Sequence, residues 1–253
     1  MTAQGETHPA VRTSDLPAGA MADHGAVQTD DIAAAKDRIR QRFRAERRAE
    51  SDAVRARRRV LLAARVDEVL AAVRQARSTP ARDTAASGPA LATTPPPAVA
   101  AFQPVAGEPD ICALLNELAR RGSSVLLPRP VGVELEWVAA DGDVMVCSAR
   151  IPRPPGRSLG LGTEPLEAAG VGLILVPALA IDPVSGSRVG YGPGFYDRLL
   201  QGWRDGEPGS VTRPLLVGVV RPAELVDVPS APHDIPVDAV LTEDGLARCE
   251  GVV

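Results

Sequence analysis

Residues 171–182 read VGLILVPALAID, and residues 186–198 follow as GSRVGYGPGFYDR. The first stretch is the most continuously apolar segment of the chain, which is typical of a strand buried on both faces of a sheet. The second stretch is rich in glycine and ends in an acidic and a basic residue, which indicates a turn into a helix. Because ligands bind beyond the carboxyl ends of strands in α/β proteins, this turn is the first candidate for a binding site.

The chain after residue 98 repeats this alternation of strand-like and helix-like segments. Short apolar runs rich in Val and Leu alternate with helical segments, as expected when strands are buried in a parallel sheet. We therefore predict an α/β fold of three layers, α/β/α, in which helices cover both faces of a mixed, mostly parallel sheet. The segments that carry this prediction are 98–105, 110–121, 123–128, 134–140, 171–177, 196–203, 215–220 and 238–243.

Two helices are expected before these strands. Apolar residues recur at spacings of three and four from Asp31 onward, and a second run of this kind continues to Val73. Ser51, followed by Asp52, is a suitable N-cap between the two helices. This part of the chain is also basic, since residues 36–59 hold eleven basic and four acidic residues. The arginines form either a solvated helix face or a basic wall over an anionic ligand.

Two segments have no periodicity. Residues 1–30 are small and polar, and we predict that they form a disordered N-terminal extension. Residues 78–98 are rich in proline, alanine, threonine and serine, which predicts a flexible insert. The α/β domain is expected to span residues 31–253, with this insert inside it.

The overall composition limits the class of protein. A formal net charge of −4 gives no general attraction to nucleic acid or membranes. No apolar run approaches the ~18 residues of a membrane helix, and residues 1–30 lack the order of a signal peptide. Three scattered cysteines fit a reducing compartment better than a disulfide framework. We expect a cytoplasmic monomer that binds neither nucleic acid nor membrane.

The glycine-rich turn has the features of an anion-binding site. Glycines at 186, 190, 192 and 194 allow positive φ and leave the backbone amides accessible. Amides at a helix N-terminus bind phosphate, because they are unpaired donors at the positive end of the helix dipole. The alternative is a plain turn, and the spacing matches neither a P-loop nor a dinucleotide-binding motif. Arg188 before the turn and Asp197 after it favour a binding site.

The segment VPALAIDPVSGSRVGYGPGFYDRLL, residues 176–200, resembles the signature of the 5-formyltetrahydrofolate cyclo-ligase family, also called methenyltetrahydrofolate synthetases. That signature runs V-P-G-L-A-F-D, a short spacer ending in R-x-G, and then G-G-G-Y-Y-D-R. The resemblance covers residues 33–246 apart from the insert. Four other segments resemble family motifs in the same order: AAKDRIRQRFRAER, GEPDICALL, LGLGTEP and HDIPVDAVLTEDG.

The resemblance implies an ATP-dependent ring closure with Mg²⁺ as the cofactor. In this family the formyl oxygen of 5-formyltetrahydrofolate is phosphorylated, N10 attacks the activated carbon, and phosphate departs to leave 5,10-methenyltetrahydrofolate. Such phosphoryl transfer depends on charge neutralisation and in-line positioning. ATP and 5-formyltetrahydrofolate are therefore the expected partners.

The positions that match the family motifs carry over its site residues. The expected catalytic residues are Arg188, Tyr196 and Asp197, and the expected Mg²⁺ ligands are Asp197 and Asp234. The residues expected to bind 5-formyltetrahydrofolate are Glu108, Tyr191, Gly192, Pro193, Gly194 and Phe195. The residues expected to bind ATP are Lys36, Arg40, Arg188, Gly190, Tyr191, Gly192, Gly194, Phe195 and Tyr196.

Several of these residues have a structural alternative. Asp197 can cap a helix, Asp234 can belong to a turn, and Glu108 can be an acidic residue at a helix N-terminus. Tyr191 and Phe195 can be ordinary core residues.

The turn departs from the family pattern at Pro193 and Phe195. Pro193 has no amide hydrogen and cannot replace the lysine that some members carry there, so we expect weaker phosphate binding if that amide normally contacts phosphate. Phe195 lacks the hydroxyl group of the usual tyrosine. The main alternative function is therefore a catalytically weakened protein that binds folate or nucleotide and buffers or senses 5-formyltetrahydrofolate. A carbohydrate-phosphate or CoA-transferase-type enzyme of similar layout is a third.

Overall fold

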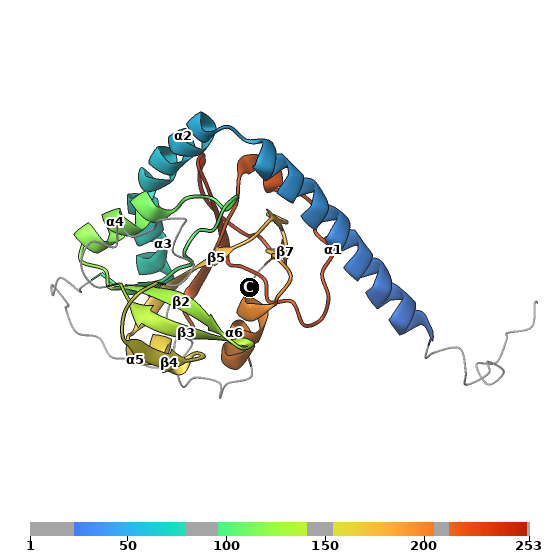
Figure 1. The fold of residues 1–253 in the computed structure, drawn as a ribbon. Helices are drawn as coiled ribbons and strands as arrows, with labels where there is room; N and C mark the ends of the chain where they lie inside the picture. The colour runs from blue at the N-terminus through green and yellow to red at the C-terminus, as the bar shows by residue number, and fades with distance from the viewer. Residues whose placement is uncertain (1–22, 79–95, 141–153, 205–212, 252–253) are drawn as a thin grey trace, which may run out of the picture.

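The computed structural model describes residues 23–78, 96–140, 154–204 and 213–251 (Figure 1). These residues build one eight-stranded sheet. In the order in which they lie side by side, its strands are β10 (Gly245–Arg248), β9 (Ala239–Thr242), β8 (Leu215–Val219), β5 (Val171–Pro177), β1 (Ala98–Ala100), β2 (Val125–Val131), β3 (Glu134–Ala139) and β4 (Ser158–Leu161).

The sheet is mixed and mostly parallel, as predicted. The five central strands, from β9 to β2, run parallel to one another. At the edges, β10 is antiparallel to β9, and β3 is antiparallel to both β2 and β4. The carboxyl ends of the central strands therefore meet at one edge of the sheet, which is where ligands bind in such folds.

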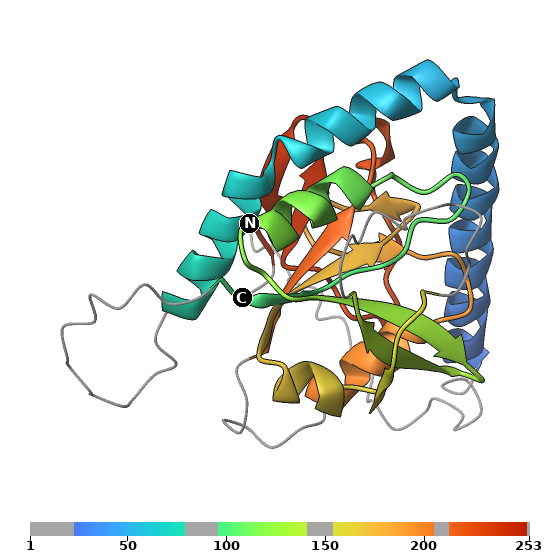
Figure 2. The same ribbon diagram turned by 60° about the vertical axis from the view of Figure 1, so that its left-hand side comes forward.

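Helices cover both faces of the sheet, which confirms the predicted three-layer arrangement. One buried apolar cluster joins α2 (Asp52–Ala63), α3 (Val66–Ser78) and α4 (Cys112–Arg120) to one face. A second cluster joins α5 (Glu164–Ala168) and α6 (Phe195–Arg204) to the other face. Figure 2 shows the two groups of helices on opposite sides of the strands.

The central strand β5 contributes to both clusters. Leu173 and Leu175 belong to the first cluster, Ile174 and Val176 belong to the second, and all four side chains are fully buried. Successive side chains of a strand point to opposite faces, so an unbroken apolar run is required here. The interpretation of the opening stretch as a strand buried on both faces is correct for residues 171–177, whereas Ala180 and Ile181 lie outside this sheet and pair with Val189 and Arg188.

The first helix, α1 (Asp23–Ala49), lies outside both helical layers. It stands at the carboxyl edge of the sheet, beside a small antiparallel pair formed by β6 (Ala180–Ile181) and β7 (Arg188–Val189) (Figures 1 and 2). Phe43 is fully buried there in a third apolar cluster, which also contains Leu179. The helix therefore covers the edge at which β5 leads into the glycine-rich turn.

Two helix boundaries differ from the predictions. The first helix begins at Asp23 rather than Asp31, so the last part of the extension predicted for residues 1–30 is helical. No proline follows Pro17 there to stop a helix. The second helical run is divided, because α2 ends and α3 begins on either side of a short turn. That turn keeps Leu62 and Val66 buried in the same cluster.

The predicted flexible insert lies mostly outside the described residues. Residues 79–95 are not described, and neither are residues 1–22 of the predicted extension. At the two ends of the insert, Ser78 is the last residue of α3 and Ala98 is the first residue of β1.

The cysteines differ from expectation at one position. Cys249 is a buried free thiol. Cys112, at the start of α4, is disulfide-bonded, so the expectation of cysteines without a disulfide is wrong there. Spacing along the chain does not report which cysteines meet in space. The scattered cysteines therefore no longer support a cytoplasmic location, which stays a prediction.

A buried ion pair attaches α1 to the sheet. The Nε and Nη2 atoms of Arg47 donate to the two carboxylate oxygens of Glu224, at 2.6 and 2.7 Å. Glu224 ends the short 3-10 helix η1 (Pro222–Glu224), which follows β8, and its side chain is fully buried. The same guanidinium donates to the Ala178 carbonyl after β5, at 2.7 Å, and to the Tyr191 hydroxyl in the glycine-rich turn. One side chain thus connects the helix, the sheet and the turn.

Further charges continue this pair along the edge of the sheet. The Nε atom of Arg221 donates to Glu224 at 2.7 Å, and its Nη1 atom lies 3.5 Å from Glu50. Arg58 connects Glu50 to Glu243, with contacts of 2.7 and 2.5 Å. Positive and negative groups alternate throughout, so each buried charge has an opposite partner, as buried charges require.

We expect Glu224→Gln to lower the free energy of unfolding by about 3–5 kcal/mol, because it leaves two buried arginines without their shared carboxylate. Urea unfolding at neutral pH measures the change. Asp67→Asn is the matched control, because it removes a carboxylate whose ion pair with Arg121 is exposed, and we expect a loss of less than about 1 kcal/mol. Equal losses in the two variants would contradict a special role for the buried pair.

Candidate active site

Two adjoining cavities lie at the carboxyl edge of the sheet. The first, which we call the apolar cavity, has a volume of about 400 Å³. Part of its wall comes from the segment after β1 and from the hairpin formed by β2 and β3. These wall residues belong to none of the sequence motifs. Those after β1 follow a strand end, which was a usable signal, whereas those of the hairpin lie within β2 and β3. The wall residues are Phe102, Gln103, Val105, Pro128, Pro130 and Leu135.

The structure brings every predicted site residue to the apolar cavity. These residues come from α1, from the loop before α4, from the glycine-rich turn with the start of α6, and from the loop before β9. Their assigned roles stay predictions, but their proximity is a finding. They are Lys36, Arg40, Glu108, Arg188, Gly190, Tyr191, Gly192, Pro193, Gly194, Phe195, Tyr196, Asp197 and Asp234.

The second cavity, which we call the charged cavity, has a volume of about 550 Å³. It has its own lining, which includes Ile32, Arg198, Gln201 and His233. The imidazole of His233 is 72% exposed and lies 3.9 Å from Asp234. The residues that line both cavities form what we call the shared wall: Lys36, Arg40, Gly192, Pro193, Gly194, Asp197 and Asp234.

Glycine is required in the turn at two of these positions. Gly192 and Gly194 have φ values of +117° and +69°, on either side of Pro193, and other residues rarely adopt such angles. Helix α6 begins directly after Gly194, and the Arg198 amide donates to the Gly194 carbonyl at 3.1 Å. The amides before Arg198 are free of intrahelical bonds, as at any helix N-terminus. The turn therefore has the geometry of an anion-binding site.

Arginines of α1 bind the carbonyl groups of the turn. The Nε atom of Arg40 donates to the Gly190 carbonyl at 3.0 Å, and Nη2 of Arg44 donates to the Tyr191 carbonyl at 2.5 Å. Other arginines of the helix, such as Arg42, are exposed. The solvated-face interpretation is therefore correct for the exposed side of the helix, and a basic wall over an anionic ligand stays a prediction for the side that faces the turn.

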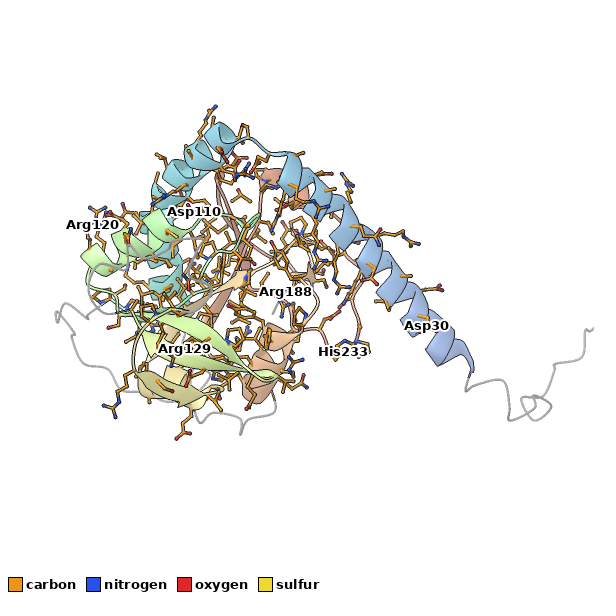
Figure 3. The ribbon with its side chains drawn as sticks, viewed as in Figure 1. Asp30, Asp110, Arg120, Arg129, Arg188 and His233 are labelled. Atoms are coloured by element: carbon orange, nitrogen blue, oxygen red, sulfur yellow. The ribbon has the colours of Figure 1, made fainter. Side chains whose placement is uncertain are left out.

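Two ion pairs lie among the site residues. Arg188, whose side chain is 3% exposed, donates from Nη2 to Asp197 at 2.7 Å. Figure 3 shows Arg188 in the interior, between α1 and the sheet. Lys36 pairs with Asp234, which also accepts from the Ala231 amide at 2.6 Å. Asp234 is thus both a turn residue and a site residue, and Asp197 has an arginine partner in the site.

Two buried donor groups in the apolar cavity have no partner among the described residues. They are the Nε atom of Arg188 and the hydroxyl group of Tyr196. Burial raises the pKa of the Tyr196 hydroxyl, so that group keeps its proton. Buried donors are nearly always hydrogen-bonded in proteins, so these two groups are available for a ligand oxygen.

Glu108 is a carboxyl group in an apolar setting. Burial raises its pKa to about 7, although its bond from the Val105 amide, at 3.0 Å, opposes this change. The alternative of a helix N-terminal acid applies instead to Asp110, which accepts from the Cys112 amide at 3.0 Å. Glu108 is therefore a titratable group at the cavity near neutral pH.

The aromatic residues of the turn serve both packing and the cavity. Tyr191 packs against the cluster around Phe43, and Phe195 packs against the cluster of α5 and α6. Both also line the apolar cavity. Tyr191 and Phe195 are therefore core residues and cavity-lining residues at the same time.

The two carboxylates of the shared wall are candidate ligands for a metal ion. Within the ranges that the structure describes, no three His, Cys, Asp or Glu side chains gather closely enough to hold a metal by themselves. Asp197 and Asp234 both line both cavities. Mg²⁺ binds to one or two carboxylates when phosphate oxygens and water complete its shell. The two residues therefore fit Mg²⁺ together with a phosphate-bearing ligand.

Relatives of known name match much of the chain. A 5-formyltetrahydrofolate cyclo-ligase from Mycolicibacterium smegmatis is 38% identical over 154 residues, which cover 57% of this chain and 72% of that protein. The protein of the same name from Saccharomyces cerevisiae is 34% identical over 74 residues, which cover 29% of this chain and 34% of that protein.

Solved structures share the fold. The NMR structure of the 5,10-methenyltetrahydrofolate synthetase from Aquifex aeolicus has a TM-score of 0.52 and 25% identity, and the match covers 84% of this chain and 92% of that one. The synthetase from Mycoplasma pneumoniae has a TM-score of 0.54 and 15% identity, with 82% and 98% covered, which bears on the fold alone.

None of the helices in the described ranges is long and apolar enough to span a membrane. The monomeric state and the absence of nucleic-acid and membrane partners stay predictions.

The family is established by sequence: residues 32–243 match the model of the 5-formyltetrahydrofolate cyclo-ligase family. The resemblance seen in the sequence motifs is thereby confirmed, and the chain belongs to the 5-formyltetrahydrofolate cyclo-ligase family.

Proposed function

We propose that the protein converts 5-formyltetrahydrofolate and ATP into 5,10-methenyltetrahydrofolate, ADP and phosphate, with Mg²⁺ as cofactor. The observation that carries this proposal is the shared wall, whose charged side chains and glycine-rich turn line two adjoining cavities, of which one also has an apolar lining. A reaction between a folate and a nucleotide needs two binding sites that meet at the reacting atoms.

The apolar cavity suits the reduced pterin. Its volume of about 400 Å³ lies within the range of small-molecule sites. Phe102, Leu135 and Phe195 provide apolar surface for the ring system. Glu108 provides a carboxylate that would pair with the amino-pyrimidine edge of the pterin, and such a pair fixes the orientation of the formyl group.

The charged cavity suits the triphosphate of ATP. Lys36 and Arg40 supply positive charge from α1, and the turn supplies amides at the N-terminus of α6. Pro193 contributes no amide, so the donors in the turn come from its neighbours.

Asp197 and Asp234 would hold Mg²⁺ against the phosphate oxygens. The ion supplies positive charge that offsets the negative charge of the phosphates. In the absence of ligands, Arg188 and Lys36 pair with these two carboxylates. When a phosphate-bearing ligand binds, the same two cations gain phosphate oxygens as partners, so the positive charge is already in place.

The reaction would proceed in two steps across the shared wall. The formyl oxygen attacks the γ-phosphorus of ATP, and ADP leaves. N10 then attacks the activated carbon and loses its proton, and inorganic phosphate leaves. Negative charge shifts onto phosphate oxygens in both steps, and donors in place before the reaction stabilise such charge. The unpartnered Arg188 Nε and Tyr196 hydroxyl are two such donors.

The test is an assay of purified protein with 5-formyltetrahydrofolate, ATP and Mg²⁺, followed by the ultraviolet absorbance of the methenyl product. We expect turnover by the natural chain and a loss of roughly 10²–10³-fold in kcat for Asp197→Asn, because the proposed Mg²⁺ ligand is lost and with it the positive charge that the ion holds at the reacting phosphates.

The control for this assay is Arg120→Ala, on the exposed end of α4 (Figure 3), which we expect to retain full activity. Saturable binding of 5-formyltetrahydrofolate without turnover by the natural chain would support the weakened binding protein instead. Neither binding nor turnover would refute both functions.

The raised pKa of Glu108 predicts how folate binding depends on pH. The free carboxyl group has a pKa of about 7, and a pterin that pairs with the carboxylate favours the ionised form. Below pH 7 the ligand competes with a proton, so the affinity for 5-formyltetrahydrofolate should fall roughly tenfold per pH unit. Above pH 7 the affinity should be constant.

Titration of the protein with 5-formyltetrahydrofolate between pH 6 and pH 8 measures this dependence. Glu108→Gln should bind folate more weakly at pH 8 and show no change with pH, whereas its affinity for ATP with Mg²⁺ should equal that of the natural chain. A pH-independent affinity of the natural chain would show that Glu108 does not pair with the pterin.

A further inference from the structure

Arg198 joins two walls that the proposed reaction uses. Its Nε atom donates to the Val133 carbonyl at 2.9 Å, and its Nη2 atom donates to the Pro193 carbonyl at 2.8 Å. Its guanidinium carbon lies 5.4 Å from the centre of the Phe195 ring. A Cβ atom on Gly194 would lie 3.1 Å from Nη1, so the turn passes close beside the guanidinium. The side chain is therefore held against the turn on two sides.

The two carbonyl acceptors belong to different parts of the site. Val133 lies in the connection between β2 and β3, and that hairpin supplies Pro128, Pro130 and Leu135 to the apolar cavity. Pro193 lies in the shared wall. Arg198 itself lines the charged cavity but not the apolar one. The guanidinium thus connects the hairpin wall of one cavity to the wall common to both.

Within the described residues, no carboxylate neutralises the charge of Arg198. Among the described residues its hydrogen bonds go to backbone carbonyls, and none of the ion pairs includes it. An arginine has five N–H donors, and two are used here. An anionic ligand in the charged cavity would therefore attract this guanidinium without first breaking an ion pair.

We propose that Arg198 is a positioning residue that couples the two cavities, so that a ligand in one cavity strengthens the binding of a ligand in the other. This inference rests on the proposed function. A phosphate-bearing ligand that attracts Arg198 fixes the turn and, through the Val133 carbonyl, the β2–β3 hairpin. A pterin that then enters the apolar cavity meets a wall that is already ordered, so its binding costs less entropy. Linkage requires the reverse effect to be equally large.

The coupling depends on the shape of the arginine head group. The guanidinium is planar and presents Nε and Nη2 in a fixed fork, so it reaches two carbonyls at once. A lysine keeps the positive charge, but its single ammonium group on a flexible stem does not hold two carbonyls in one geometry. Arg198→Lys therefore separates the effect of charge from the effect of the bridge.

The experiment measures four dissociation constants in the natural chain and in Arg198→Lys. They are those of 5-formyltetrahydrofolate with and without a non-hydrolysable ATP analogue plus Mg²⁺, and those of the analogue plus Mg²⁺ with and without 5-formyltetrahydrofolate. In the natural chain we expect each ligand to tighten the other by the same factor, about 5-fold or more. In Arg198→Lys we expect a factor near 1, with each separate affinity changed less than about threefold.

The matched control is Arg121→Lys. Arg121, at the end of α4, also connects two acceptors, Asp67 and Glu117, but lines neither cavity. It should keep the natural coupling factor, and thermal unfolding of each variant identifies a folding defect. If the lysine variant at 198 does not fold, Arg198→Gln removes the bridge and the charge together, and its coupling factor should also be near 1.

Two results would overturn the inference while leaving the proposed function intact. One is turnover by the natural chain with no coupling between the ligands. The other is a coupling factor in Arg198→Lys that equals that of the natural chain. This result follows when the affinity for each ligand falls equally in the presence and in the absence of the other ligand. Absence of both turnover and folate binding in the natural chain would instead refute the proposed function and this inference with it.

Discussion

The arrangement of the site depends on the buried pair of Arg47 and Glu224. Helix α1 lies outside the two helical layers, and its apolar contact with the sheet is the small cluster around Phe43. The ion pair, with the bonds from Arg47 to the Ala178 carbonyl and the Tyr191 hydroxyl, adds fixed polar contacts to this small apolar one. Replacing a buried pair by apolar residues is often neutral for stability, so its main effect here is on geometry. It sets where the cations of α1 stand relative to the turn.

Much of the fold was predictable because the signals are local. The apolar run of β5 has to be buried on both faces, and the strand-to-helix turn at Gly192 and Gly194 follows from residue types that few other conformations suit. The resemblance added the positions of Lys36, Glu108 and Asp234, which are far apart in the chain yet line one cavity. Short edge elements such as β4 and β10 were missed, because a few residues at an edge carry little pattern.

The rest depends on contacts that no local pattern reports. Eleven basic residues between positions 36 and 59 look alike in sequence, and nothing there indicates that Arg47 is the buried one or that its partner is Glu224. Phe102 and Leu135 reach the cavity because β1 lies between β5 and β2, an order that the sequence does not state. Pro193, which departs from the family pattern, has no amide hydrogen. The structure shows that its carbonyl accepts a hydrogen bond from Arg198.

The shared wall has a consequence for inhibition. Residues 192–194 of the turn, together with Lys36, Arg40, Asp197 and Asp234, line both cavities, so the two cavities adjoin. If the cavities hold folate and ATP as proposed, a single molecule that joins a reduced pterin to a polyphosphate by a short linker would occupy both, and its second half would bind at a high effective concentration. Proteins that bind only nucleotides or only folates would hold one half of such a bisubstrate compound. Its selectivity would therefore come from the spacing between the cavities rather than from the chemistry of either one.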